Sequence, residues 1–474
     1  MIVRPREYLN NGMPTEQMLK SVLFEHLNGL PRLEQLKAYY LADNAIKHRQ
    51  RAPGLPNNRV AHAFARYIAM ITSGYLVGQP VSYAVDEDNA TLNAILDSFA
   101  RNAVSAADSE LARDASIYGK GVEYVYVDAD LRPRVAPLSP ESAFVVYDDT
   151  YETLPLFGVY FTPRRHEDGT DDGVRIWVMS AAEIAEYQAS SLDSIAFTEI
   201  RRTQHYFGDV PMVEYWNDDD ERGDFEWVIP LIDAYDKLQS DRINDKEQFV
   251  DKLLLLFGCT MDTDERGRPP WQQLREDKSL SLPDTDSRAE YLGSAMDESG
   301  NQILRAGLVE DIHKLSMVPD MSDKNFANNV SGVAMRYKLM GLEQLTVIKQ
   351  RWFTEGLKQR LKLFIHHFTM RGSEALDVTN IKIKFSRAMP ANLLEIAQTV
   401  QTADSAGAMS VEEKVRALHT ADEWTKEDIA REVQRIHDDK AEQDPMGLFG
   451  NRILPGNTDD QIDEQLALDQ QRGA

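Results

Sequence analysis

The chain has 474 residues, of which 42% are hydrophobic, so it is long enough for two or three domains with cores of their own. Its formal net charge of −25 argues against tight nucleic-acid binding, which needs clustered lysine and arginine, but allows a contact with DNA that must stay weak. No window approaches the roughly 18 apolar residues of a membrane span. The single cysteine, Cys259, excludes an intramolecular disulfide framework.

The first part of the chain is predicted to be helical. Thr15 is a candidate N-cap for a helix through His26, and Pro31 suits the first turn of a second helix. Turn-forming residues separate the elements that follow. We expect helices at 59–75, 89–101 and 106–118, with a short strand at 81–85.

From Gly121 the apolar period changes to two. Runs such as "VEYVYVD", "LFGVYFT" and "VRIWVMS" are typical of strands, and turn formers such as "EDGTDDG" lie in most of the gaps. Residues 1–229 are therefore predicted to form an α+β unit with an antiparallel meander. The unit ends at the acidic loop "NDDDERGDFEW".

At Pro230 the helical period returns for about 27 residues, ending in the apolar run 253–257. Residues 260–293 are predicted to form a compact insertion of turns, short strands and one short helix. Helical patterns then follow at 301–314 and 331–371, and the second contains Gly341 and Gly356 as plausible bend points.

The last part of the chain begins with an alternating, strand-like segment at 378–390. Polar helices are expected after it, with Ser410 and Glu413, and Thr425 and Asp428, as capping pairs. The tail 441–474 is acidic and poor in apolar residues, so we predict that it is disordered. The fold class is helix-rich α+β: a discontinuous body with a protruding rod, which neighbouring copies would stabilise in an oligomer.

The sequence contains no Walker A, GxGxxG, HExxH, GxSxG or paired CxxC pattern. The loop that starts at Asp262 resembles a calcium loop but has Gln273 where the bidentate acid belongs. We therefore predict no catalytic residue, no metal site and no cofactor. Two alternatives stay open: a metal-dependent nuclease or hydrolase that uses the acidic cluster 218–224, and a monomeric scaffold or adaptor protein.

Three stretches carry a resemblance to a known family. They are "YYLADNAIKHR…PNNRVAHAFARYIAMITSGYLVGQPVSY" (39–83), "VPMVEYWNDDDERGDFEWVIPLIDAYDKLQSDRINDKEQF" (210–249) and "VPDMSDKNFANNVSGVAMRYKLMGLEQL" (318–345). Their order and spacing resemble the portal proteins, or head-to-tail connectors, of long-tailed bacteriophages, especially the branch typical of phages of Gram-positive hosts.

The resemblance implies a portal-type subunit and assigns a role to each segment. The expected parts are a wing at 1–229 with a returning strand at 373–390, a stem at 230–257 and 299–317, a clip at 258–298, a tunnel loop at 318–330, a spine helix at 331–372, a crown at 391–440 and the tail at 441–474.

The resemblance also implies the function and the partners. Portal proteins of this kind form rings, usually of twelve subunits, at one capsid vertex. Double-stranded DNA passes through the axis during packaging and ejection, and its contact with the ring is weak and independent of sequence. The implied partners are terminase, the major capsid and scaffolding proteins, and a head-completion or tail connector protein. The implied location is the virion, after assembly in the host cytoplasm and without a membrane.

A neutral loop suits such a channel, because amide side chains can bond to phosphate without a charge that would hold the DNA. Lys324 supplies one cation, which Asp323 partly offsets. Lys246 and Lys252 are candidate channel-facing cations of the stem, although pairing with neighbouring acids is an equal possibility. The predicted tunnel-loop residues are Asp323, Lys324, Asn325, Phe326, Asn328, Asn329, Ser331 and Gly332.

Overall fold

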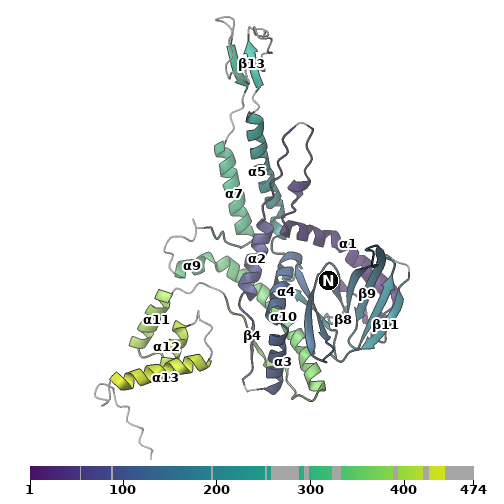
Figure 1. Cartoon of the computed structure of the whole chain (residues 1–474), viewed down its shortest axis with the longest axis vertical. Coiled ribbons are helices and arrows are strands. Elements are labelled where there is room, and N and C mark those ends of the chain that lie inside the picture. Colours follow the sequence, from purple (N-terminus) through teal and green to yellow (C-terminus); the bar gives the residue numbers. More distant parts are fainter. Residues whose placement is uncertain are drawn as a thin grey trace, which may run out of the picture. The chain divides into compact units, whose positions relative to one another are not determined.

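The structure is a computed structural model in which the chain divides into two compact units, Met1–Ala388 and Met389–Ala474 (Figure 1). The residues that it describes are 1–53, 55–86, 89–193, 196–250, 253–257, 288–292, 298–322, 332–387, 393–419 and 426–443.

The first unit contains a six-stranded sheet with the order β1-β7-β8-β9-β10-β11. Neighbouring strands from β7 to β11 are antiparallel and follow one another along the chain, which confirms the predicted meander, whereas β1 joins β7 in parallel. The strands are β1 (Ile2–Val3), β7 (Ala143–Tyr147), β8 (Pro155–Arg165), β9 (Asp171–Met179), β10 (Glu183–Ala189) and β11 (Thr198–Gln204).

Each face of this sheet is covered by a different layer. One face packs on helix α1 (Glu16–Tyr40), where Val22 and Leu23 meet Phe144 and Phe157. The other face packs on a three-stranded sheet with the order β12-β5-β6. The strands of this second sheet are β5 (Lys120–Val127), β6 (Pro133–Leu138) and β12 (Met212–Trp216).

Helix α1 confirms one prediction and corrects another. The Thr15 hydroxyl accepts a hydrogen bond from the Met18 amide at 3.2 Å, as expected of an N-cap. The two predicted helices are wrong, however, because Pro31 lies inside one continuous helix. Proline costs the helix one backbone hydrogen bond, but Leu33 and Leu36 beyond it are buried in the core, and this packing offsets the loss.

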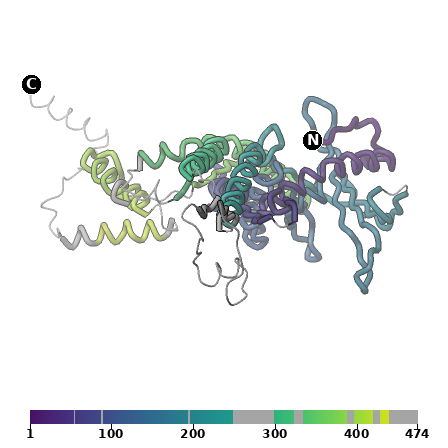
Figure 2. Tube along the Cα trace, turned by 90° about the horizontal axis from the view of Figure 1, so that it is seen from above, coloured from purple at the N-terminus to yellow at the C-terminus, as the bar shows by residue number. Residues whose placement is uncertain are grey.

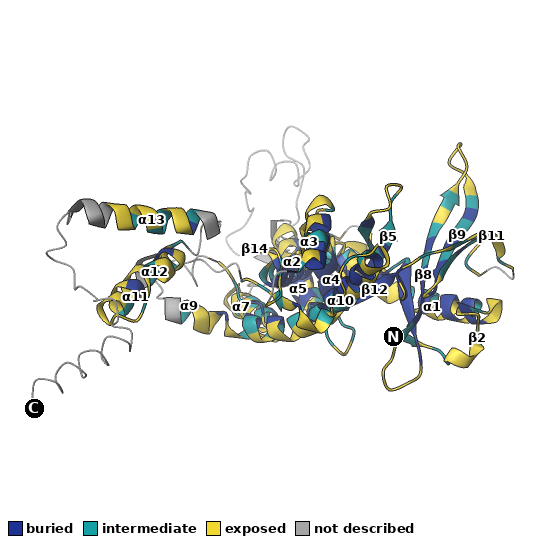
Figure 3. Ribbon diagram, turned by 90° about the horizontal axis from the view of Figure 1, so that it is seen from below, coloured by how far each residue is buried: buried dark blue, intermediate teal, exposed yellow. Residues whose placement is uncertain are grey.

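A group of helices lies beside the two sheets, and its inner faces are dark blue in Figure 3. It consists of α2 (Phe64–Val77), α3 (Ala90–Arg101), α4 (Val104–Tyr118) and α10 (Met340–Met370). The helix predicted from residue 59 begins only at Phe64, because the Val60 amide donates to the Ser240 hydroxyl at 3.0 Å and keeps this stretch extended.

The late strand returns to the early part of the chain, as the sequence predicts, but it is shorter than the predicted segment 378–390, because Val378–Asn380 form a 3-10 helix. Strand β15 (Lys382–Lys384) pairs antiparallel with β4 (Ser82–Ala84). A short hairpin completes the strands of the N-terminal region. It consists of two strands of two residues each, β2 (Leu9–Asn10) and β3 (Met13–Pro14). The short 3-10 helices are η1 (Arg6–Tyr8), η2 (Ala45–His48), η3 (Glu226–Val228) and η4 (Val378–Asn380).

Helices α5 (Ile229–Val250) and α7 (Glu298–Leu315) lie side by side (Figure 1, Figure 2). The predicted helix through residue 257 is wrong, because it ends at Val250 and Leu253–Phe257 form strand β13, which pairs antiparallel with β14 (Arg288–Leu292). A short, continuous apolar run suits a helix or a strand equally well, so only the distant partner strand decides between them.

The predicted spine helix is interrupted once. Helix α9 covers Gly332–Lys338, Leu339 is a turn residue, and α10 continues to Met370. Gly341 and Gly356 both lie inside α10, so the interruption falls two residues before Gly341. A bend at either glycine stays a prediction.

The second unit contains three helices among its described residues: α11 (Leu393–Ser405), α12 (Val411–Leu418) and α13 (Lys426–Gln443). Ser410 and Glu413 form the predicted capping box at the start of α12. Thr425 and the tail beyond Gln443 lie outside the described residues. No described helix of either unit is long and apolar enough to cross a membrane.

Candidate functional site

The predicted tunnel loop falls mostly outside the described residues. This holds for Asp323, Lys324, Asn325, Phe326, Asn328, Asn329 and Ser331, whereas Gly332 is the first residue of α9. The described structure shows what holds the chain on both sides of the segment 323–331.

On the upstream side, the chain is fixed as far as Met321. Val318 is fully buried, and its carbonyl oxygen lies 2.9 Å from Nδ1 of His313 at the end of α7. The Tyr67 hydroxyl of α2 donates to the Pro319 carbonyl at 2.8 Å and accepts from the Met321 amide at 3.0 Å. A single side chain of α2 therefore holds the root of the segment through two backbone groups.

On the downstream side, α9 joins α10 at the buried residue Leu339. The Leu339 amide donates to the Met335 carbonyl at 3.0 Å, and the Leu339 carbonyl accepts from the Glu343 amide at 2.9 Å. The hydrogen-bond ladder thus passes through the interruption. Tyr337 and Met340 are 72% and 53% exposed, so the joint is packed on one side and open on the other.

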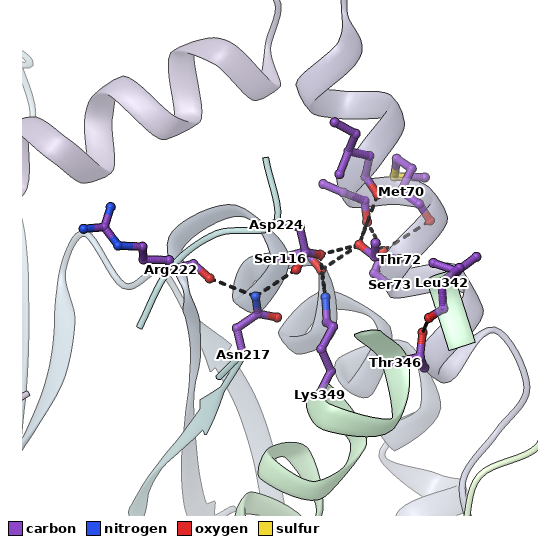
Figure 4. Close-up of polar contacts among 12 residues, drawn as sticks. Met70, Thr72, Ser73, Ser116, Asn217, Arg222, Asp224, Leu342, Thr346 and Lys349 are labelled. Atoms are coloured by element: carbon purple, nitrogen blue, oxygen red, sulfur yellow. Dashed lines mark hydrogen bonds and ion pairs between the residues drawn. The ribbon is translucent and has the colours of Figure 1, made fainter. Parts of the chain in front are cut away.

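Lys349 on α10 is buried in a polar network that joins four elements (Figure 4). Its ammonium group lies 2.5 Å from the Asp224 carboxylate and 2.7 Å from the Ser116 hydroxyl of α4. Thr72 of α2 donates to the same carboxylate oxygen, and the Asn217 amide donates to the other at 2.8 Å. Lys349 and Asp224 have only 2% and 1% of their side-chain surfaces exposed, so each charge depends on the other.

Arg360 is the centre of a second buried network. Its guanidinium group binds both carboxylate oxygens of Glu123 on β5, each at 2.8 Å, and Asp108 on α4 at 2.7 Å. The Tyr215 hydroxyl of β12 also donates to Glu123, at 2.7 Å. Burial raises the pKa of Glu123, and the Arg360 guanidinium opposes that shift. One cation therefore binds acids from two elements, β5 and α4, and joins both to α10.

These two networks fix α10 along its axis. Lys349 and Arg360 are eleven residues apart, which is about three helical turns, so both lie on the same face of the helix. A helix that slid or rotated would separate two buried ion pairs, and breaking such a pair by removing one partner costs about 3–5 kcal/mol. From Lys349 onward, α10 is a fixed support for the chain that precedes it.

The acidic cluster 218–224 is used for structure. Asp224 is the partner of Lys349, and the Asp218 carboxylate accepts from the Arg222 amide at 3.2 Å. Burial raises the pKa of Asp218. Across the ranges that the structure describes, no three or more His, Cys, Asp or Glu side chains are arranged to hold a metal ion. The geometry gives the nuclease alternative no support.

Of the two predicted stem cations, Lys246 is exposed on α5 between Asp245 and Glu247, which are also exposed. It contributes, after Arg242, to the lowered pKa of Glu298 on α7. Lys252 lies outside the described residues. A channel-facing role for either residue stays a prediction.

Sequence reasoning missed Lys349, Arg360 and their acids. The available signal was the position of the two cations within the apolar stripe of α10, beside buried residues such as Phe353 and Leu357. A cation on a buried helix face requires an acid, but the partners Asp224 and Glu123 are more than a hundred residues away and follow no local pattern.

Comparisons with known proteins show the family of the chain. The family model described as "Phage portal protein, SPP1 Gp6-like" matches residues 19–446. The chain is 22% identical to the portal protein of Bacillus phage SPP1 over 95% of this chain and 91% of that protein. It is also 22% identical to the portal protein of Clostridium phage phiCD119 over 77% of this chain and 84% of that protein.

Two solved structures are similar at 13–14% sequence identity. A chain in the neck of an empty GTA particle gives a TM-score of 0.46 over 75% of this chain and 90% of that chain. A chain in the virion of a native gene transfer agent (GTA) gives a TM-score of 0.42 over 75% and 89%.

The family model matches nearly the whole chain, and the portal proteins of two phages are similar to it in sequence. These matches identify the class of protein. The chain belongs to the SPP1 Gp6-like family of phage portal proteins. The predicted portal function is confirmed, as is the resemblance to portals from phages of Gram-positive hosts. The protein is a structural component of a phage particle.

Proposed function

We propose that copies of this chain form a closed ring, with twelve as the expected number, around an axis through which double-stranded DNA enters and leaves the capsid. The family match over residues 19–446 carries the proposal. In this arrangement the chain has no enzymatic activity. The energy for packaging is supplied by terminase, which docks on the ring before the tail connector does.

The surface of the helix pair α5–α7 supports assembly. Ile303 and Leu304 on α7 are 75% and 53% exposed, and Ile243 on α5 is also exposed. These exposed apolar side chains are suited to a contact surface. Packing against the neighbouring copy would remove them from water, and the repeat of this contact closes the ring.

The charge supports a conduit rather than a tight DNA ligand. With a net charge of −25 on each chain, a ring of about twelve copies carries a few hundred negative formal charges. Such a ring holds DNA loosely, so that the duplex can move. We assign the contact with DNA to the neutral segment 323–331, which is rooted at Tyr67 on one side and at Leu339 on the other.

Imaging of the purified protein tests the ring. We expect closed rings by negative-stain electron microscopy and a discrete oligomer by mass photometry; single copies at every concentration and salt would contradict the proposal. The tunnel loop is tested separately by replacing Asn325, Asn328 and Asn329 with alanine. We expect rings to form normally while DNA packaging falls, and normal packaging would exclude the role of these amides.

A further inference from the structure

A loop that connects α1 with α2 lies along one face of helix α5. This loop, residues 43–62, which we call the strap, runs beside α5 in Figure 1 and is described except for Gly54. It belongs to the first of the three stretches that resemble portal proteins, and most of α5 belongs to the second. The portal function described above gives the strap no role.

The two ends of the strap are fixed to α5 inside the fold. The buried Asp236 carboxylate accepts from the Asn44 side-chain amide at 2.5 Å and from the His62 backbone amide at 3.0 Å. The Val60 amide donates to the Ser240 hydroxyl at 3.0 Å. Asp236 and Ser240 are four residues apart, so both ends of the strap are held at one level of the helix.

The outer part of the strap is fixed by polar contacts farther along α5. Arg49 and Arg51 both bind the Asp241 carboxylate, Arg49 at 2.9 Å. The Asn58 amide donates to Oδ1 of Asn244 at 2.7 Å. Asp241 and Asn244 are three residues apart, so these contacts also lie on a single face of the helix.

The tip of the strap is open to water. Leu55, the large apolar residue of the tip, is 51% exposed and does not fix the strap by burial. The side chain of Asp241 is partly exposed as well, so that water and salt reach its two ion pairs. Polar contacts of this kind can be exchanged for contacts with water.

The seam between the strap and α5 also contains buried polar atoms that lack a partner. Within the described ranges, no hydrogen bond is made by Nε and Nη2 of Arg49, Oδ1 of Asn57 and Nδ2 of Asn244. A buried donor or acceptor without a partner is unfavourable, because folding has removed its hydrogen bond to water. Opening of the strap would return these atoms to water. The ion pairs of Asp241 therefore hold the strap closed against an unfavourable contribution from its own seam.

We propose that the outer part of the strap, residues 49–58, is a releasable clasp on the helix pair α5–α7. When the clasp is closed, Asp241 and Asn244 tie the outer turns of α5 to the body of the chain. When it is open, those turns are held by α7, through contacts such as the ion pair between Arg242 and Glu298. Because α5 leads to strand β13, the clasp sets how freely the far end of the helix pair moves.

Asp241→Asn removes the charge that closes the clasp, and Asp245→Asn is the matched control. Asp245 lies four residues farther along α5, is exposed and takes no part in the contacts above. Trypsin cleaves after arginine and lysine, so it cuts an open strap at Arg49 or Arg51, at a rate that follows the population of the open form. At low salt we expect the strap of D241N to be cut roughly tenfold faster than that of D245N.

Salt provides a second measurement that needs no variant. Raising the salt concentration should speed up cleavage of the wild-type strap, because it screens the ion pairs of Asp241, and should change cleavage of D241N less. Cleavage of D241N in the same buffers corrects for the effect of salt on trypsin. Equal cleavage of D241N and D245N at every salt concentration would overturn the proposal.

Hydrogen exchange tests whether the clasp acts on α5 itself. In D241N we expect the amides of residues 241–247 to exchange roughly threefold faster than in D245N, whereas the first turns of α5, where Ile232 and Tyr235 are buried, should be unchanged. Faster cleavage of the strap without faster exchange in α5 would contradict the proposal, because the strap would then open without freeing the helix. Both measurements can be made on single copies and on rings, so failure of ring assembly is distinguishable from failure of the clasp.

Discussion

Helix α10 is held differently in its first turns and in the stretch from Lys349 to Arg360. In the later stretch, two buried cations bind acids from α4, β5 and the loop before η3. In the first turns, one face is packed through Leu342, whereas Met340 and Ile348 are exposed and no buried ion pair is recorded among the described residues there. The helix is thus anchored by buried charges in the middle, whereas its first turns have apolar contacts and a partly exposed ion pair between Glu343 and Arg387 at 3.3 Å.

The two glycines of α10 show the same contrast. A Cβ atom added to Gly356 would lie 2.5 Å from the ring of Tyr215, so helix and strand β12 are in contact at that point. A Cβ atom added to Gly341 would lie 3.6 Å from the Met317 carbonyl, which is an ordinary contact distance. Gly356 is required by close packing, whereas Gly341 leaves room. The part of α10 nearest the proposed channel is therefore the part with freedom to adjust.

The largest effect is expected from Arg360→Met. This change leaves Glu123 and Asp108 buried without their cation, which lowers the free energy of unfolding by about 3–5 kcal/mol. Chemical denaturation followed by circular dichroism measures it.

The matched control for that experiment is Lys358→Met on the same helix. Lys358 pairs with Glu355 at 2.8 Å on the surface, and the loss of such a pair costs at most about 1 kcal/mol. If R360M proved as mild as K358M, the middle of α10 would not be held by its buried charges.

Gly356→Ala tests the close contact between α10 and β12. The added methyl group meets the Tyr215 ring, which is itself fixed by its hydrogen bond to Glu123. Overpacking of this kind costs about 1–3 kcal/mol, so the denaturation midpoint should fall clearly. A variant with wild-type stability would mean that the helix can move away from the strand, contrary to the anchoring inferred here.

A third test concerns an acid that α10 does not neutralise. Asp114 lies on α4, the helix that supplies Asp108 and Ser116 to the two networks, but its ion pair is with Arg113 at 3.4 Å, and the Arg113 side chain is partly exposed. Burial raises the pKa of Asp114 to about 6 from its usual value of 3.8. The native state therefore binds this proton more tightly than the unfolded state does.

The sign follows from that difference. The contribution of Asp114 to the free energy of unfolding is close to zero below about pH 4. It becomes destabilising as the pH rises from about 4 to 6, and it stays destabilising above about pH 6. A shift of two units corresponds to no more than about 3 kcal/mol, and we expect about half of it because the carboxylate is partly solvated. Asp114→Asn should raise the melting temperature at pH 7.5 and leave it nearly unchanged at pH 4. An equal change at both pH values would contradict the assignment.

The difference between local and distant contacts explains which features the sequence predicts well. Local signals are reliable: Thr15 and the Ser410–Glu413 pair cap helices where expected, and the alternating runs after Gly121 form the meander. Errors occur where a distant partner decides. Pro31 stays inside a helix because of the packing beyond it, and the run 253–257 becomes a strand because it pairs with β14.

The two buried networks of Lys349 and Arg360 could not be predicted from local sequence patterns, because their partners are also distant in the sequence. Lys349 binds Asp224, and Arg360 binds Glu123, across more than a hundred residues of sequence. The portal resemblance predicted the function without predicting these contacts, since its three stretches define a family rather than the ion pairs within it.

The smallest effect on stability is expected from Gly341→Ala. This variant distinguishes the effect of helix rigidity on DNA packaging from any effect on the stability of the fold. Alanine fits without a close contact and favours the helix by about 0.5 kcal/mol, so the folded protein should be slightly more stable and rings should assemble normally. If the first turns of α10 must adjust while DNA passes, packaging should nevertheless decrease, because the variant stiffens the helix next to the Leu339 joint. Unchanged DNA packaging in G341A, measured beside the wild-type protein, would show that the space around Gly341 has no role in the passage of DNA.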